Sequence, residues 1–277
     1  MKKKLFCALI IALIMAGCAS SAVIFSTRIG YLTRLNTTED EFKSIITKAG
    51  RTSDWSIFTS NHEMFGVKFY DSLMTMQMAL EAREIDEIAL PEMTALYLMH
   101  MNPDLKVCCA AHSHYPMSLS FGFRADSRAL AEKINGVLKQ MEEDFTLANL
   151  QGQFINNSED FTPIEIAKFP GADTIKVALT GDMPPIDYVA ADGKPAGFNT
   201  ALLAEIGRRL RINIEMLNIE TGSRTAALTS GRVDIVFWYE TSKNPELNAD
   251  APDGVILSEP YYSWNTFLHI CKKTARQ

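Results

Sequence analysis

The chain has 277 residues, of which 47% are hydrophobic and 22% are charged, and its formal net charge at pH 7 is −6. This composition is that of an ordinary globular protein, and no excess of basic residues suggests nucleic-acid binding. A chain of this length can form one large domain or two smaller lobes, each with its own core.

The N-terminus has the features of an export signal. Lys2, Lys3 and Lys4 precede the apolar stretch LFCALIIALIMAG, which has signal-peptide length and is too short to favour a spanning helix. The end of this stretch and the cysteine after it, Met15-Ala16-Gly17-Cys18, resemble the lipobox of bacterial lipoproteins, in which the cysteine is lipidated and becomes the new N-terminus. The alternative is an ordinary secretory signal cut near the same place. Both predict that the mature chain works outside the cytoplasm.

Export into an oxidising space makes the remaining cysteines informative. Beyond Cys18 the chain has Cys108, Cys109 and Cys271. Cys108 and Cys109 lie on an extended run, so their side chains point to opposite faces and are poor partners for each other. We therefore expect lone buried thiols. No CxxC spacing indicates a metal site.

The first part of the chain alternates strand and helix patterns, which favours an α/β fold with largely parallel sheets. HSH at 112–114 lies near an expected hinge, where a solvated loop is favoured over a catalytic role. The predicted strands are 22–33, 67–72, 85–90, 105–111 and 117–125, and the predicted helices are 36–50, 73–84 and 91–103. Residues 127–155 are predicted to form a long helix followed by a shorter one.

Residues 156–173 then interrupt this pattern with polar residues, two prolines and a glycine, as a linker does. After the linker the alternation restarts, so the second part of the chain also predicts strands flanked by helices. Its strands are predicted at 174–180, 212–219, 233–239 and 265–273, and its helices at 199–211 and 223–231.

The second part of the chain carries a resemblance to a known family. TIKVALTGDMPPIDYVAADGKPAGFNTALLAEIGRRLRINIEMLNI, followed by AALTSGRVDIV and LSEPYY, resembles the first lobe of the family 3 extracellular solute-binding proteins, the periplasmic amino-acid receptors of ABC transporters. The segment FYDSLMTMQMALEAREIDEIAL resembles a helix and a strand of the second lobe of these proteins. The segment MSLSFGFRADSRALAEKINGVLKQMEEDFTLANLQGQFI resembles the strand by which the chain returns from the second lobe to the first, followed by the closing helix. The resemblance implies a two-lobed type 2 periplasmic binding fold, in which hinge strands join two mostly parallel sheets flanked by helices.

The order of these segments predicts a circular permutation. Residues 1–17 would be the lipoprotein signal peptide and 18–27 an anchor linker. Residues 28–115 would form lobe two, 116–155 the return hinge strand and closing helices, and 156–173 a linker between the old termini. Residues 174–277 would form lobe one and the outgoing hinge strand. The rival interpretation is a tandem of two truncated receptors, which would leave two half domains with open apolar faces.

The resemblance also implies where a ligand would bind. Met183 stands where the family has an aromatic residue, and Glu246 and Leu247 stand where it has a carboxylate-binding arginine, so Lys243 or Arg224 could replace that arginine. Pro91 occupies the position of the ammonium-binding aspartate, and the adjacent Glu92 could take its role. The remaining candidates are Thr37 and Thr38 at a helix N-terminus, and Trp238, Tyr239 and Thr241 at the end of a strand.

Several of these residues have an equally plausible structural role. Asp182 and Asp187 flank the double proline and could bind a cation or an amine, or could instead accept hydrogen bonds from turn amides. Trp238 could fill core volume, and the two threonines could simply cap a helix.

The resemblance implies a binding protein, and no sequence motif of an enzyme is present. The expected protein is a monomeric, lipid-anchored, extracytoplasmic receptor that passes a small polar solute, an amino acid or a related molecule, to an ABC transporter permease. It would bind no nucleic acid, metal or cofactor. The alternative is a regulatory, sensor or scaffold lipoprotein that kept the fold but lost amino-acid recognition.

Overall fold

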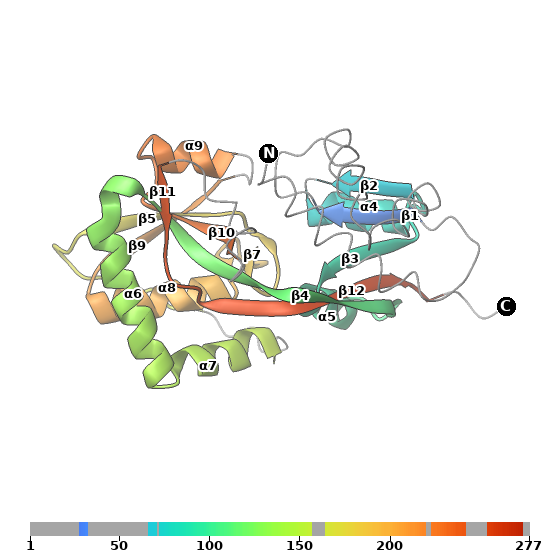
Figure 1. Cartoon of the computed structure of the whole chain (residues 1–277), viewed down its shortest axis with the longest axis horizontal. Coiled ribbons are helices and arrows are strands. Elements are labelled where there is room, and N and C mark those ends of the chain that lie inside the picture. The colour runs from blue at the N-terminus through green and yellow to red at the C-terminus, as the bar shows by residue number, and fades with distance from the viewer. Residues whose placement is uncertain are drawn as a thin grey trace. The chain divides into compact units, whose positions relative to one another are not determined.

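A computed structural model describes residues 28–32, 66–70, 72–156, 164–219, 223–241 and 254–273 (Figure 1). The chain divides into two compact units. Unit 1 comprises residues 1–116, 242–249 and 264–277, and unit 2 comprises residues 117–241 and 250–263. Among the helices in the described ranges, none has the length and hydropathy that a membrane span requires.

Unit 1 is built on a parallel trio of strands. β1 (Arg28–Leu32) lies between β2 (Gly66–Tyr70) and β3 (Glu87–Pro91) and is parallel to both. The far side of β3 pairs antiparallel with β12 (Tyr262–Lys272), a strand that begins in unit 2. The predicted strands around β2 and β3 are confirmed, and the predicted strand 22–33 is confirmed over β1.

Two helices pack on this sheet, α4 (Leu73–Glu81) and α5 (Glu92–Met101), both close to their predicted ranges. α4 begins at Ser72, whose hydroxyl accepts a hydrogen bond from the N–H of Thr75 at 3.2 Å, as an N-cap does. The core of unit 1 joins side chains from residues 73–105 with side chains from β12, and includes Met76, Leu80, Ile88, Leu98, Leu268 and Ile270.

Unit 2 repeats the same strand arrangement. β5 (Thr174–Leu179) lies between β9 (Asn213–Asn218) and β10 (Ile235–Thr241) and is parallel to both. β10 pairs antiparallel with β4 (Leu105–Arg124), a strand that begins in unit 1, and β4 pairs antiparallel with β11 (Val255–Leu257). Each unit therefore receives its antiparallel strand from a long strand that starts in the other unit.

The helices of unit 2 follow amphipathic patterns. α6 (Arg128–Glu143) follows a short 3-10 turn (Ala125–Ser127) and buries Ile134, Leu138 and Met141, which are spaced for one helix face. The other helical elements are α7 (Thr146–Gln151), a π-helical turn (Gly152–Asn156), α8 (Phe198–Leu210) and α9 (Arg224–Thr229). A small separate sheet contains β6 (Asp182–Met183), β7 (Asp187–Val189) and β8 (Pro195–Ala196).

The segment around HSH differs from its prediction. The sequence predicts two strands separated by a solvated loop at 112–114, but the backbone runs as one continuous strand, β4, through this segment. β4 is a neighbour of both β12 and β10, so strand pairing supplies backbone hydrogen bonds that a window of local sequence does not reveal.

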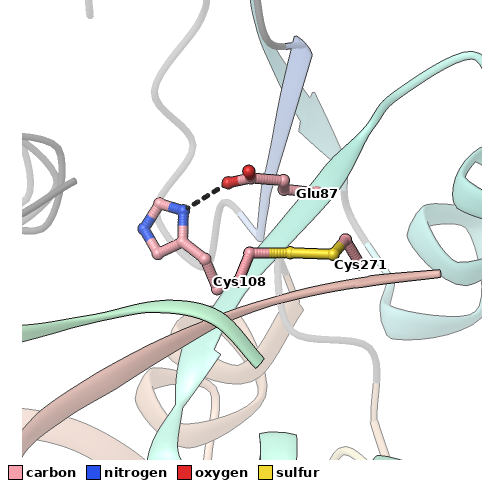
Figure 2. Close-up of a disulfide and its surroundings, with 4 residues drawn as sticks. Glu87, Cys108 and Cys271 are labelled. Atoms are coloured by element: carbon pink, nitrogen blue, oxygen red, sulfur yellow. Dashed lines mark hydrogen bonds and ion pairs between the residues drawn. A yellow bond between two sulfur atoms is a disulfide. The ribbon is translucent and has the colours of Figure 1, made fainter. Parts of the chain in front are cut away.

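The prediction of lone buried thiols is wrong for two of the three cysteines. Cys108 on β4 and Cys271 on β12 form a disulfide with a Cα–Cα separation of 6.1 Å (Figure 2). Cys108 is exposed and Cys271 is half-buried. The two residues are 163 positions apart in the sequence, and only the pairing of the two long strands brings them together. The side chain of Cys109 lies outside the described set.

Candidate functional site

The double-proline turn lies between the end of β5 and the start of α8. The peptide bond between Pro184 and Pro185 is cis. The carbonyl oxygens of Pro185 and Ile186 accept hydrogen bonds from the N–H groups of Phe198 at 3.0 Å and Asn199 at 2.8 Å. These bonds satisfy two N–H groups that a helix start leaves without an intrahelical partner, and they fasten the turn to α8.

Gly197 permits this contact because it has no side chain. Its φ is 94°, and a Cβ atom at this position would lie 2.5 Å from the carbonyl oxygen of Pro185 and 2.8 Å from that of Ile186. Both the backbone conformation and the close approach require glycine. Gly197 and Phe198, which lie within the segment that resembles the family, therefore have a structural role at the start of α8.

Asp187 holds the loop that follows β5. Its carboxylate accepts hydrogen bonds from the N–H of Thr180 at 2.9 Å, from the hydroxyl of Thr180 at 3.0 Å and from the N–H of Gly181 at 3.3 Å. Asp187 is 1% exposed. Of the two roles that the sequence left open for Asp187, the structure contains the bonding to turn amides.

Arg224, a candidate replacement for the missing arginine, is the first residue of α9 and is buried. Its guanidinium donates a hydrogen bond to the carbonyl oxygen of Phe237, at the point where β10 reaches the candidate residues Trp238 and Tyr239. The guanidinium thus holds the backbone of β10 at Phe237.

Three further polar residues gather in this region that sequence reasoning missed: Thr180, Asn199 and Tyr261. Tyr261 is buried, with its ring stacked on Phe121 at a centroid distance of 4.5 Å. Burial, followed by the negative charge of Asp187, raises the pKa of Tyr261 well above its ordinary value, so the phenol stays protonated. A nearby arginine and Asn199 oppose this shift.

Asn199 and Tyr261 are unusual among buried polar residues. Within the described part of the chain, the amide group of Asn199 and the hydroxyl of Tyr261 make no hydrogen bond of normal geometry. Buried polar groups of this kind are uncommon, so Asn199 and Tyr261 are polar positions inside unit 2 that packing alone does not explain. Thr180 could have been found from the sequence, because it is the last residue of a predicted parallel strand and so lies at the carboxyl end of that strand.

The other candidates of unit 2 lie on the same strands and turn. Met183 is on β6 and is buried at 4% exposure, which agrees with a role as an apolar wall. Asp182 is also on β6, and Trp238, Tyr239 and Thr241 end β10, where the pairing with β4 is irregular between Val236 and Tyr239. For these last four residues the structure describes the backbone and not the side chains.

Among the candidates that the structure describes, one lies in unit 1. Glu92 is the first residue of α5, directly after β3, and its side chain is exposed. A carboxylate in the first turn of a helix is favoured by the helix dipole, so this position also has a purely structural explanation. The candidates Thr37, Thr38, Lys243 and Cys18 fall outside the described residues.

Unit 2 also contains a pocket that the sequence did not predict. It has a volume of about 780 Å³ and lies between α6, α7 and the segment 259–263. Gly136 of α6 lines it, and a Cβ atom added there would meet no other atom within 4 Å. None of the predicted ligand-binding residues lines this pocket. In the described ranges, no group of three or more His, Cys, Asp or Glu side chains could hold a metal ion.

Residues 175–273 match the model of the bacterial extracellular solute-binding proteins, family 3. The match spans β5 to the end of β12 and includes the double-proline turn, Gly197, Arg224 and Tyr261. The predicted resemblance is therefore confirmed over this part of the chain, and the α/β type 2 periplasmic binding fold that it implies agrees with the parallel trios of strands.

Solved structures of solute-binding proteins are similar to the chain. The periplasmic aliphatic sulphonate binding protein SsuA from Escherichia coli is 12% identical, with a TM-score of 0.43, over 89% of this chain and 64% of that protein. The alkanesulfonate-binding protein SsuA from Xanthomonas axonopodis pv. citri, bound to MOPS, is 11% identical, with a TM-score of 0.43, over 91% and 67%. The chain thus spans about two thirds of the length of these proteins. No curated protein matches the chain in sequence.

Proposed function

We propose that the protein is an extracytoplasmic solute-binding receptor that captures a small polar solute and delivers it to the permease of an ABC transporter. The observation that carries this proposal is the family match over residues 175–273. That segment contains the residues that follow β5 and those that follow β10, and polar groups at the carboxyl ends of parallel strands are where ligands bind in such folds.

The strand pairing supports a single, circularly permuted receptor. Residues 28–115 would be lobe two, 116–155 the return strand with its closing helices, 156–173 the joint between the old termini, and 174–277 lobe one with the outgoing strand. β12 completes the sheet of unit 1, and β4 completes that of unit 2. In the tandem alternative, each half would lack this antiparallel strand.

For the ligand we propose an amino acid or a related molecule that carries a carboxylate. Met183, Trp238 and Tyr239 would form an apolar and aromatic wall, and Asp182, Asp187 and Thr241 would add polar groups. Lys243 would bind the carboxylate, since the guanidinium of Arg224 already holds the backbone of β10. Glu92 would take an ammonium group, with Thr37 and Thr38 near an anionic group. Cleavage before Cys18 would leave the chain lipid-anchored outside the cytoplasm.

Thermal unfolding tests the proposal. The chain from residue 18 on, with Cys18→Ser to keep it free of lipid, would be screened against amino acids, dicarboxylates, amines and short peptides. A ligand at about one hundred times its dissociation constant adds about 2.7 kcal/mol to the stability. A rise of several degrees in the unfolding temperature is expected with one chemical class of ligand. That class would show whether Lys243 and Glu92 replace the carboxylate-binding arginine and the ammonium-binding aspartate of the family.

Three variants separate the proposed site from the other pocket. Trp238→Leu and Lys243→Ala should remove the ligand-induced shift, whereas Gly136→Leu, which fills the pocket beside α6, should leave it intact. If Gly136→Leu alone removes the shift, the ligand binds beside α6 and the proposed site is wrong. If no class produces a shift while the chain unfolds cooperatively, the result favours a regulatory, sensor or scaffold lipoprotein.

A further inference from the structure

The strands β4 and β12 carry the chain between the two units. β4 leaves unit 1 after Pro116, and β12 leaves unit 2 after Ser263. The two strands are neighbours in the sheet (Figure 1). The ties between the two strands therefore determine how firmly each of them is held in the sheet.

β4 and β12 are linked to each other by side chains in both units. In unit 2 the hydroxyl groups of Ser118 and Ser263 form a hydrogen bond of 2.8 Å. In unit 1 the tie is the disulfide between Cys108 and Cys271 (Figure 2). Its Cα–Cα separation of 6.1 Å lies in the usual range of about 4.4 to 6.8 Å, so the backbone positions suit a disulfide.

The disulfide joins a weakly held strand to a firmly held one. After the buried Leu105, the side chains of Lys106, Val107 and Cys108 are all exposed. Because neighbouring residues of a strand point to opposite faces, this stretch of β4 has little buried side-chain surface on either face. Strand pairing and the disulfide are what hold it to unit 1.

Near Cys271, β12 makes contacts with unit 1 that do not involve the disulfide. Leu268 and Ile270 belong to the core of unit 1. Between them, the buried His269 donates a hydrogen bond from Nδ1 to the carboxylate of Glu87 on β3 at 3.1 Å (Figure 2). The ammonium group of Lys272 pairs with Glu81 of α4. These contacts do not depend on the disulfide, so β12 should remain in place when the disulfide is reduced.

We propose that the Cys108–Cys271 disulfide is a reversible redox clamp, which fastens the first part of β4 to β12 and is released without unfolding of the protein. Exposed disulfides are the accessible and labile ones, whereas buried structural disulfides resist reduction. A dithiol reductant attacks one sulfur and forms a mixed disulfide. Its second thiol then displaces the other cysteine, which leaves two cysteine thiols and one disulfide on the reductant. The clamp is independent of the proposed function, because it concerns the connecting strands and not the ligand site.

Amide hydrogen exchange on the full chain carrying Cys109→Ser tests the proposal, since this substitution removes the neighbouring thiol that could exchange. The chain is compared before and after dithiothreitol treatment under native conditions, and its free thiols are counted with a thiol reagent. We expect two new thiols, a retained cooperative unfolding transition and about tenfold faster exchange at residues 106–110, with unchanged exchange in β5 and β9.

Two further variants serve as controls. Cys108→Ser combined with Cys271→Ser should reproduce the fast exchange at 106–110 and make it insensitive to dithiothreitol. Ser118→Ala, which removes the other tie, should keep the full response to dithiothreitol. The proposal is wrong if the disulfide stays oxidised until the chain unfolds, if reduction leaves exchange at 106–110 unchanged, or if reduction accelerates exchange throughout both units.

Discussion

Asp187 has the largest identifiable role of any single residue in the candidate site. Three donors from Thr180 and Gly181 converge on its buried carboxylate. This residue fixes the loop that connects β5 to the double-proline turn. Any ligand contact made by that loop depends on it, whether or not the carboxylate itself touches the ligand.

We therefore predict that Asp187→Ala lowers the free energy of unfolding by about 3 kcal/mol, because it leaves buried N–H groups without an acceptor. Asp192→Ala is the matched control. Asp192 also accepts a backbone hydrogen bond, from Lys194 at 3.0 Å, but in an exposed turn, so its loss should cost at most about 1 kcal/mol. Urea denaturation measures both values, and equal losses would contradict the proposed role of Asp187.

At the scale of elements, the start of α8 depends on a glycine that cannot be replaced. We predict that Gly197→Ala destabilises the protein by about 3 kcal/mol, since it combines an unfavourable φ with close contacts to two carbonyl oxygens. Gly193→Ala tests the φ contribution alone: its φ is 78°, but an added Cβ atom meets nothing within 4 Å, so about 1 kcal/mol is expected. A similar loss for both variants in urea denaturation would show that the contact with the turn is unimportant.

The junction of α7 and α8 should give a pH-dependent stability. Hydrogen bonds from the hydroxyl and the N–H of Thr146, and a further one from Arg209, lower the pKa of Asp144 to about 2. The carboxylate of Asp144 lies 2.7 Å from the guanidinium of Arg209 on α8. Because the folded-state pKa is depressed, the stabilisation is present above the ordinary pKa of 3.8 and is lost as the pH falls towards 2.

We thus predict that the protein is more stable than its Asp144→Asn variant at pH 6 and that the difference shrinks between pH 4 and pH 2. Denaturant unfolding of both proteins across this range measures it. A difference that stays constant down to pH 2 would mean that the charge of Asp144 makes no contribution.

At the scale of the whole molecule, the exchange of β4 and β12 makes each unit dependent on a distant part of the chain. Residues 1–163 lack β12, which supplies Leu268 and Ile270 to the core of unit 1. Residues 164–277 lack β4, whose Phe121 and Phe123 are fully buried. Neither part has the complete sheet that a single folding unit requires.

We predict that neither part, produced alone, gives a cooperative unfolding transition, and that mixing or co-expressing the two restores one. The slope of urea denaturation is informative, because it scales with the surface exposed on unfolding. For the recombined parts it should match that of the intact chain. Cooperative unfolding of each isolated part, with a slope suited to its own size, would instead favour the tandem interpretation.

The sequence by itself determined the features that depend on neighbouring residues. Strand and helix periodicity predicted most elements, such as α4, β5 and β10, because burial on one face repeats at a fixed spacing along the chain. The order of TIKVALTGDMPPIDYVAADGKPAGFNTALLAEIGRRLRINIEMLNI, AALTSGRVDIV and LSEPYY along the chain indicated the family. The role of Asp187 as a turn residue was one of the two that the sequence left open, and it could be foreseen because the backbone amides that Asp187 binds lie only seven residues or fewer away.

Tertiary structure alone decided the features that join distant segments. Cys108 and Cys271 pair because β4 and β12 lie side by side, and nothing near either cysteine indicates its partner. The continuity of β4 through HSH has the same cause. Tyr261 lies near Asp187 and Asn199 because residues 250–263, which precede most of β12, belong to unit 2. This part of the candidate site therefore forms only when the sheet is assembled. Local sequence encodes which faces are buried, whereas strand pairing between distant segments determines which residues meet.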